Sequence, residues 1–178
     1  MADTGPANVT LAQIGARVGL TAAALLRRFG SKDRLLLALA RNAVDAVPAR
    51  LAGARNAERP IAALIDAFAA MAGTVRNAAE FANHLAFLLM DLSVPEFQQV
   101  TREYAAAVEA AISTVLQAGA DAGELRRDQL DDELPQAVHA AYNGALITWG
   151  MAGDAADPAE HIRRHLWRLM RPLLNVPA

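Results

Sequence analysis

Alanine is the residue that most constrains the fold of this chain, because it occupies 42 of the 178 positions. Alanine is the best helix former, and leucine and arginine follow it closely. Alternating β-branched runs bounded by turn residues, which would predict strands, are nearly absent. The sequence therefore predicts an all-α protein.

The overall composition excludes several classes of protein. Apolar residues make up 54% of the chain and charged residues 20%, which favours a packed core over disorder. The chain has no cysteine, so disulfides, thiolate metal sites and cysteine nucleophiles are excluded. No apolar run reaches membrane-spanning length, and the N-terminus lacks the features of a secretory signal. We therefore expect a cytoplasmic protein with no membrane partner.

The first thirty residues have the pattern of two short helices joined by a tight turn. Residues 10–13 (TLAQ) have the spacing of a capping box, which predicts a helix that runs to about Val18. Gly19 suits the left-handed position that ends a helix, and Thr21 can cap a second helix that runs to about Phe29. Followed by a third helix, this pattern predicts a helix-turn-helix module.

Helix-breaking residues divide the remainder of the chain into longer helices. Pro48 is expected to end or kink the helix that begins at Ser31, because proline lacks the backbone N–H. Pro60 and Pro158 suit the first positions of later helices, and residues 121–132 read as a polar loop. The expected helices cover residues 31–47, 60–76, 79–92, 95–120, 133–151 and 158–174.

The charge is distributed unevenly along the chain. Residues 1–41 hold six basic and two acidic residues, a net charge of +4, whereas residues 42–178 hold eleven basic and seventeen acidic residues, a net charge of −6. A small basic module on a larger acidic one is expected when only the first part meets a polyanion. Chance clustering of charges on a solvated face is the alternative.

Residues 10–39, TLAQIGARVGLTAAALLRRFGSKDRLLLAL, resemble the tetracycline-repressor (TetR/AcrR) family of bacterial transcription regulators. Downstream, the similarity is one of helical layout, with a Gly-Glu-Leu-Arg stretch at Gly123–Arg126 and an apolar pair of C-terminal helices. The resemblance implies a helix-turn-helix DNA-binding module at residues 1–41 and a helical-bundle domain for effector binding and dimerisation at residues 42–178. The matching residues are Thr10, Ile14, Gly19, Leu20, Thr21, Leu25, Phe29, Ser31, Lys32 and the run Leu35–Leu37.

The chain departs from the family pattern at its start. The family begins with a helix that packs against the helix-turn-helix, and the stretch that looks like the following loop begins here at residue 5. Met1–Thr4 would then be only a stump, so we expect the first family helix to be missing or truncated. Without it, Ile14, Val18, Leu25 and Phe29 would lose a packing partner, at about 1.5–3 kcal/mol for each exposed side chain.

A second departure lies in the recognition helix. Ala22–Ala24 and Leu26 stand where family members usually carry polar residues and a tyrosine. These side chains offer no hydrogen bonds to base edges or phosphates and can only touch thymine methyl groups. Gly15 replaces the usual alanine, at an expected cost to its helix of about 0.5–1 kcal/mol.

The resemblance implies DNA contacts for five residues. Lys32 matches a backbone-contact position, and Arg17 lies on the short helix that usually crosses the backbone. Arg27 and Arg28 would meet phosphate or guanine, or else are solvated charges at a helix end. Thr21 is a helix cap and a candidate phosphate donor.

The helical domain contains candidates for an effector pocket. Large side chains on its middle helices would form an apolar cavity, with a few polar groups to orient a ligand; plain core packing is the alternative. The candidates are Phe68, Met71, Phe81, His84, Phe87, Tyr104, Asn143 and Trp149.

The two C-terminal helices have a second apolar face. The resemblance implies that they form a four-helix bundle in a homodimer, and a monomer core is the alternative. The expected interface residues are Tyr142, Ala145, Trp149, Leu166, Leu169, Met170 and Leu173.

Motifs for catalysis are lacking in the sequence. It has no Gly-rich phosphate loop, no G-x-S-x-G and no H-E-x-x-H. His161 and His165 have a spacing that can grip a metal, but only Glu160 supports this, and arginines crowd the helix. We therefore expect no enzyme activity, no cofactor and no metal.

The leading hypothesis is a homodimeric, ligand-responsive transcriptional regulator that represses by binding operator DNA. A small, mostly apolar effector would release it. The alternative is a helical ligand-binding or scaffold dimer that has lost DNA binding. Its partners would then be itself and a small molecule, without double-stranded DNA.

Overall fold

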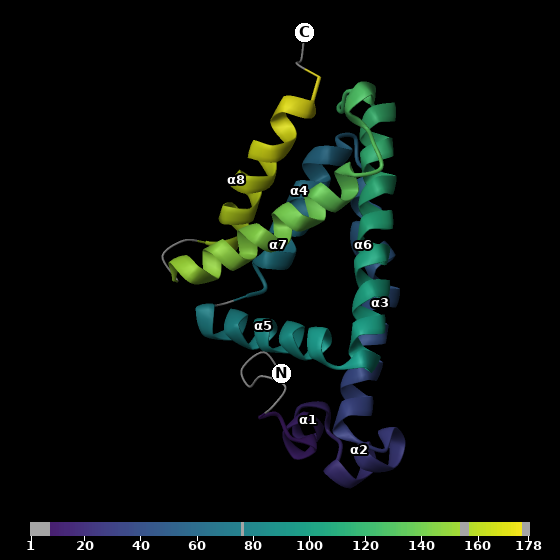
Figure 1. Cartoon of the computed structure of the whole chain (residues 1–178), viewed down its shortest axis with the longest axis vertical. Helices are drawn as coiled ribbons and strands as arrows, with labels where there is room; N and C mark the ends of the chain where they lie inside the picture. Colours follow the sequence, from purple (N-terminus) through teal and green to yellow (C-terminus); the bar gives the residue numbers. More distant parts are fainter. Residues whose placement is uncertain (1–7, 76, 154–156, 176–178) are drawn as a thin grey trace. The chain divides into compact units, whose positions relative to one another are not determined.

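The fold was obtained as a computed structural model that describes residues 8–75, 77–153 and 157–175. The described residues form α-helices, two short 3-10 helices and no β-strand, so the all-α prediction is confirmed (Figure 1). The elements are α1 Leu11–Val18, α2 Ala22–Phe29, α3 Lys32–Arg55, α4 Pro60–Ala72, α5 Ala78–Ser93, α6 Pro95–Asp121, η1 Arg127–Gln129, α7 Leu134–Ala152, α8 Pro158–Met170 and η2 Arg171–Leu173.

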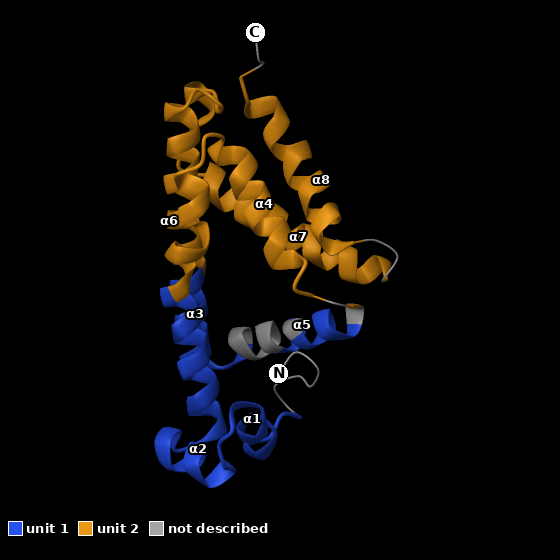
Figure 2. Ribbon diagram, turned by 180° about the vertical axis from the view of Figure 1, so that it is seen from behind, with its two compact units in different colours: residues 1–45, 79–104 blue, residues 46–78, 105–178 orange. Residues whose placement is uncertain are grey.

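The chain forms two compact units (Figure 2). One unit comprises residues 1–45 and 79–104, and the other comprises residues 46–78 and 105–178. Helices α3 and α6 each contribute residues to both units. The division of function at residue 41 that the sequence suggests stays a prediction.

The third helix is longer than the sequence predicts. It continues through Pro48 to Arg55 instead of ending near residue 47. Proline removes one helical hydrogen bond, but Val47 and Leu51 on either side of it are buried, and their packing offsets this loss. At the other end of the chain, α8 stops at Met170 and a 3-10 turn containing Pro172 follows, so the predicted end near residue 174 was too late.

The helix-turn-helix forms with the caps that the sequence predicts. Thr10 Oγ1 accepts a hydrogen bond from the Gln13 backbone N–H at 3.2 Å, while the Thr10 N–H donates to Gln13 Oε1 at 2.8 Å, which completes the capping box. Gly19 ends α1 in the left-handed region with φ 69°. Thr21 Oγ1 then accepts from the Ala24 N–H at 3.1 Å and starts α2.

A small apolar cluster holds these helices against the start of α3. Val9, Ile14, Leu25 and Leu35 are buried, and Phe29 packs against them from a partly buried position. The expected loss of packing at Ile14 and Leu25 is therefore not observed, because residues of the module itself cover them. Of the four side chains expected to lose a partner, only Val18 is largely exposed, at 61%.

Gly15 allows the following turn to pack closely against α1, which its helix propensity alone does not indicate. A Cβ atom at this position would lie 2.3 Å from the backbone oxygen of Leu20. The Leu20 N–H also donates to the Gly15 carbonyl at 2.9 Å, so the turn folds back directly onto α1 at this point. The helix-propensity cost of Gly15 is thus smaller than the cost of the clash that any side chain at this position would cause, because the turn packs against α1 only when residue 15 is glycine.

The second unit is built around α8. This helix packs against both α4 and α7, and Arg163 Nε donates to Asp66 Oδ1 across the α4–α8 contact at 3.0 Å. The core is apolar, and its largest buried side chains include Ile61, Leu64, Ile65, Phe68, Ile112, Leu116, Trp149, Ile162, Leu166 and Met170.

The Gly-Glu-Leu-Arg stretch caps a helix that lies far away in the sequence. Gly123 follows α6 with φ 75°, and the next side chain turns toward the start of α4. There Glu124 Oε2 accepts from the Ile61 N–H at 2.8 Å, and Glu124 Oε1 lies 3.4 Å from Arg59 Nη2. Because α4 has no capping side chain of its own, Glu124 supplies both a hydrogen-bond acceptor and a favourable charge.

The same stretch pairs with the tail that follows α8. The Arg126 N–H donates to the Leu173 carbonyl and the Asn175 N–H to the Glu124 carbonyl, each at 3.0 Å. Asn175 Nδ2 also donates to the Gly123 carbonyl at 2.7 Å. Segments 123–126 and 173–175 are thus held together by backbone and side-chain hydrogen bonds.

Replacing Gly15 by alanine should destabilise the helix-turn-helix by about 1–3 kcal/mol, the usual cost of overpacking. The new Cβ would meet a backbone oxygen, which no side-chain rotation can relieve. Gly53→Ala is the matched control, because it lies inside α3 with open space around its Cβ position and should stabilise by about 0.5–1 kcal/mol. Urea unfolding followed by circular dichroism measures both effects; equal effects of the two variants would contradict the close approach.

Replacing Glu124 by alanine should destabilise the second unit by about 1–3 kcal/mol, because the Ile61 N–H loses its only capping acceptor. Glu124→Gln keeps an acceptor oxygen and should lose clearly less. Thermal unfolding of the two variants beside the parent makes the comparison. If glutamine proved as damaging as alanine, the capping role would be refuted.

Candidate nucleic-acid interface

The five predicted DNA-contact residues all lie in the helix-turn-helix of the first unit. Arg17 is in the last turn of α1, Thr21 caps α2, Arg27 and Arg28 are in the last turn of α2, and Lys32 is the first residue of α3. All are exposed except Lys32, which is half-buried. The fold thus brings them into one small module, although their contacts with DNA stay a prediction.

Thr21 and Arg28 have structural partners within the module. Thr21 already acts as a cap, since its oxygen accepts the Ala24 N–H, and its hydroxyl proton remains available to a phosphate. The Arg28 guanidinium lies over the ring of Phe29, 5.4 Å from its centre, at cation–π distance. Arg28 is therefore held beside the end of α2, whereas Arg27 lies at an exposed position.

Part of the solvent-facing side of α2 is apolar. Ala23, Leu26 and Arg27 are exposed on it at helical spacing, whereas Leu25 points into the buried cluster. Leu26 is 51% exposed. We call Ala23, Leu26 and Arg27 the outer face of α2.

The predicted effector-pocket residues are divided between the units. In the second unit Phe68 and Trp149 are buried, Met71 is half-buried and Asn143 is exposed; the ring of Phe68 lies 4.6 Å from that of Tyr142. In the first unit Phe81 is buried and Tyr104 is half-buried. The side chains of His84 and Phe87 lie outside the described residues. Their gathering around one ligand stays a prediction.

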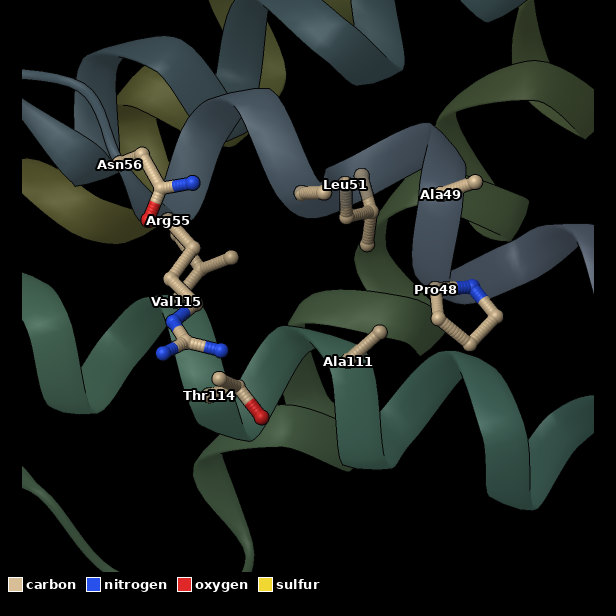
Figure 3. Close-up of a pocket in the computed structure, with 9 residues that line it drawn as sticks. Pro48, Ala49, Leu51, Arg55, Asn56, Ala111, Thr114 and Val115 are labelled. Atoms are coloured by element: carbon tan, nitrogen blue, oxygen red, sulfur yellow. The ribbon is translucent and has the colours of Figure 1, made fainter.

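The second unit contains a groove that the sequence did not indicate, between α3 and α6 (Figure 3). Its volume is about 360 Å³, within the range of small-molecule sites. Small side chains on both helices leave the space, and this alanine spacing is the one sequence signal that could have located it. The lining residues are Pro48, Ala49, Leu51, Ala52, Arg55, Asn56, Ala111, Thr114 and Val115.

The predicted dimer residues are largely occupied within the single chain. Four of the seven are buried because the apolar stripes of α7 and α8 pack against each other and, for α8, against α4. On α7 the structure instead exposes Ile147 at 39% and Met151 at 82%, which the sequence analysis did not single out. The buried four are Ala145, Trp149, Leu166 and Met170, and the half-buried three are Tyr142, Leu169 and Leu173.

The exposed side of α8 is basic. Arg164 and Arg168 on α8, followed by Arg171 at the start of η2, line a groove of about 1230 Å³. Two carboxylates of this groove, Glu124 and Glu160, are already engaged with Arg59 and Arg163 respectively. An interface through this side would therefore need carboxylates from the partner.

His161 and His165 stack on each other, with ring centres 4.1 Å apart. His161 Nε2 lies 3.4 Å from Thr148 Oγ1, and Arg164 Nη2 lies 3.2 Å from His161 Nδ1. Burial lowers the pKa of His161 from its ordinary value, and the neighbouring His165 and Arg164 lower it further. In the described part of the chain, no group of three or more His, Asp or Glu residues is placed to hold a metal ion.

His139 on α7 is half-buried within the second unit. Its Nδ1 lies 3.4 Å from Glu109 Oε1, which satisfies its polar ring within the second unit.

The search for membrane spans, over the same described residues, finds no helix that combines the necessary length and apolarity.

The capped bihelical corner and the basic residues around it form a helix-turn-helix module, and the rest of the described chain is helical. Residues 1–39 match the family described as bacterial regulatory proteins, tetR family. No curated protein sequence matches the chain.

Solved structures share the fold over nearly the whole chain. A TetR transcription regulator from Haloarcula marismortui is 17% identical with a TM-score of 0.76, and the similarity covers 95% of this chain and 89% of that one. SmeT, the repressor of the Stenotrophomonas maltophilia multidrug efflux pump SmeDEF, is 18% identical, with a TM-score of 0.72 and coverage of 98% and 84%. A transcriptional regulator from Saccharomonospora viridis in complex with choline is 24% identical, with a TM-score of 0.75 and coverage of 98% and 92%.

At these identities the solved structures establish the fold, and the match at residues 1–39 adds the family signature. Residues 1–39 thus carry the signature of the tetR family, and the chain as a whole shares the fold of solved structures from that family.

The depressed pKa of His161 makes the second unit less stable in acid. The unfolded chain binds the proton more readily than the folded one, so the stabilising contribution of neutral His161 is present above a pH of about 6.5 and is lost as the pH falls through the folded pKa. Unfolding free energies at a series of pH values should fall less steeply in acid for His161→Gln than for the parent. Arg164→Gln should weaken the dependence partly, and an unchanged slope in both variants would contradict this assignment.

Proposed function

We propose that the protein is a homodimeric, ligand-responsive transcriptional repressor that binds operator DNA from the cytoplasm and has no catalytic role. The single observation that carries the proposal is the capped helix-turn-helix at residues 10–32, within the stretch that matches the tetR family. SmeT, which shares the fold, is described as a repressor, and this supports the direction of regulation.

Affinity for DNA would come mainly from the basic residues of the module. In this proposal Arg17, Arg27, Arg28 and Lys32 meet phosphates, and the N-terminus of α3 adds backbone donors beside Lys32. Thr21 contributes a hydroxyl at the start of α2. The net charge of −6 in residues 42–178 keeps the remainder of the chain away from the polyanion.

A homodimer supplies the two helix-turn-helix modules that an operator with two half-sites requires. Helix-turn-helix dimers bind half-sites about 34–36 Å apart, so the second unit must pair two copies at a fixed spacing. Tyr142, Leu169 and Leu173 remain partly exposed for such an interface, and Ile147 and Met151 extend it on α7.

The effector would act by shifting a population between conformers. A regulator of the same fold was solved with choline, which supports a small-molecule ligand. The groove between α3 and α6 is a candidate site beside the predicted pocket, and both helices contribute residues to the DNA-binding unit as well. A ligand moves the equilibrium only through its differential affinity for the two conformers.

The second candidate function, a helical ligand-binding or scaffold dimer without DNA binding, is favoured by one observation. The outer face of α2 offers hydrogen bonds only through Arg27. A DNA-binding measurement separates the two candidates directly.

The full chain should bind fragments from a genomic library in a gel-shift assay at low salt. Four phosphate-contacting residues in each of two protomers give about eight contacts, so affinity should fall by about 10³–10⁵-fold between about 50 and 200 mM salt. The double variant Arg27→Gln/Arg28→Gln should weaken binding to all fragments and flatten the salt dependence. Arg102→Gln, at an exposed arginine on α6 that contacts Gln99, removes one charge and is the matched control for the single variants Arg27→Gln and Arg28→Gln, which should each show part of the loss. Absence of binding by the parent would leave the scaffold dimer.

A further inference from the structure

The outer face of α2 presents alkyl groups where a recognition helix usually presents hydrogen-bonding groups. Ala23 and Leu26 are exposed three residues apart, and Arg27 adjoins them. Leu26 is 51% exposed even though the opposite side of α2 buries Leu25 almost completely. Leu25 therefore stabilises the corner, whereas the described part of the chain leaves Leu26 in solvent.

The polar groups near this face leave little capacity for reading bases through hydrogen bonds. The Thr21 oxygen caps α2 and leaves only its hydroxyl proton, while Arg28 lies over the Phe29 ring and keeps its N–H donors; in the proposed function both groups are assigned to phosphates. Arg27 is the one side chain of the outer face that can donate to a base edge or a phosphate. Discrimination between base pairs must then come from shape and apolar contact.

The major groove offers one kind of apolar group, the C5-methyl of thymine. Basic residues flank the outer face, with Arg27 on it, Arg17 at the end of α1 and Lys32 at the start of α3. An apolar protein partner would have no use for these charges, whereas duplex DNA combines phosphates at the groove edges with methyl groups inside it. Charge and chemistry together therefore select duplex DNA as the occupant.

We propose that this protein reads its operator through thymine methyl groups, with Leu26 as the main specificity-determining residue and Ala23 as a second contact. The inference rests on the proposed DNA-binding function. Arg27 then supplies the single directional contact, and the hydrogen-bonding patterns of the thymine-bearing base pairs are left unread.

Replacing thymine by deoxyuridine tests the inference, because it removes the methyl group and keeps the hydrogen-bonding pattern. Duplexes are first selected from a random library with the full chain, and each thymine of the best duplex is then replaced singly by deoxyuridine. We expect at least one thymine in each half-site whose replacement weakens binding about fourfold, and about sixteenfold for both half-sites together, the factors that correspond to one buried methyl group each.

Leu26→Ala should abolish this penalty, so that thymine and deoxyuridine duplexes bind equally to the variant. Leu39→Ala is the matched control, because Leu39 is also an exposed leucine of the first unit, at 42%, but lies on α3; it should retain the full penalty. Circular dichroism confirms that both variants fold, as is expected for exposed positions.

The outcomes separate the two levels of the argument. If the chain binds DNA but no deoxyuridine replacement weakens binding, or if the penalty survives in Leu26→Ala, the readout by methyl groups is overturned and the proposed function stands. If the chain selects no duplex at all, the proposed function fails and the inference falls with it.

Discussion

The close contact between α1 and the turn that follows it is the constraint on which the DNA-binding module depends. The backbone oxygen of Leu20 occupies the space that a side chain at residue 15 would need. With the turn packed there, Ile14 and Leu25 contact Leu35 in a common cluster. The caps Thr10 and Thr21 fix the N-terminal ends of the two helices. The module is thus held by one steric fit, one buried cluster and two local hydrogen-bonded caps.

Local signals in the sequence predicted this module well, because the residues that determine it are neighbours in the chain. The capping box at Thr10, the left-handed Gly19 and the cap at Thr21 each act within a few residues of their partners. The role of Gly15 was misjudged, since propensity describes a helix alone and the decisive contact comes from the following turn.

The second unit was harder to predict, because its interactions join residues far apart. Burial of Val47 and Leu51 on either side of Pro48 kept α3 continuous, and the apolar stripes of α7 and α8 were used within the chain instead of remaining free for a partner. The Gly-Glu-Leu-Arg stretch was visible as a pattern, but nothing local revealed that Glu124 caps α4 or that its backbone pairs with the tail. Contacts of the proposed site with DNA and effector depend on molecules that the sequence does not contain.

The separation of contacting residues in the sequence also sets the order in which the chain can assemble. The apolar cluster of the helix-turn-helix lies between Val9 and Leu35. In contrast, the bond from Ile61 to Glu124 spans 63 residues and that from Arg163 to Asp66 spans 97. Closing longer loops costs more chain entropy before any contact compensates for it, so topology favours early folding of the small module and later closure of the larger unit. During synthesis, the helix-turn-helix can therefore form before the long-range contacts of the second unit are made.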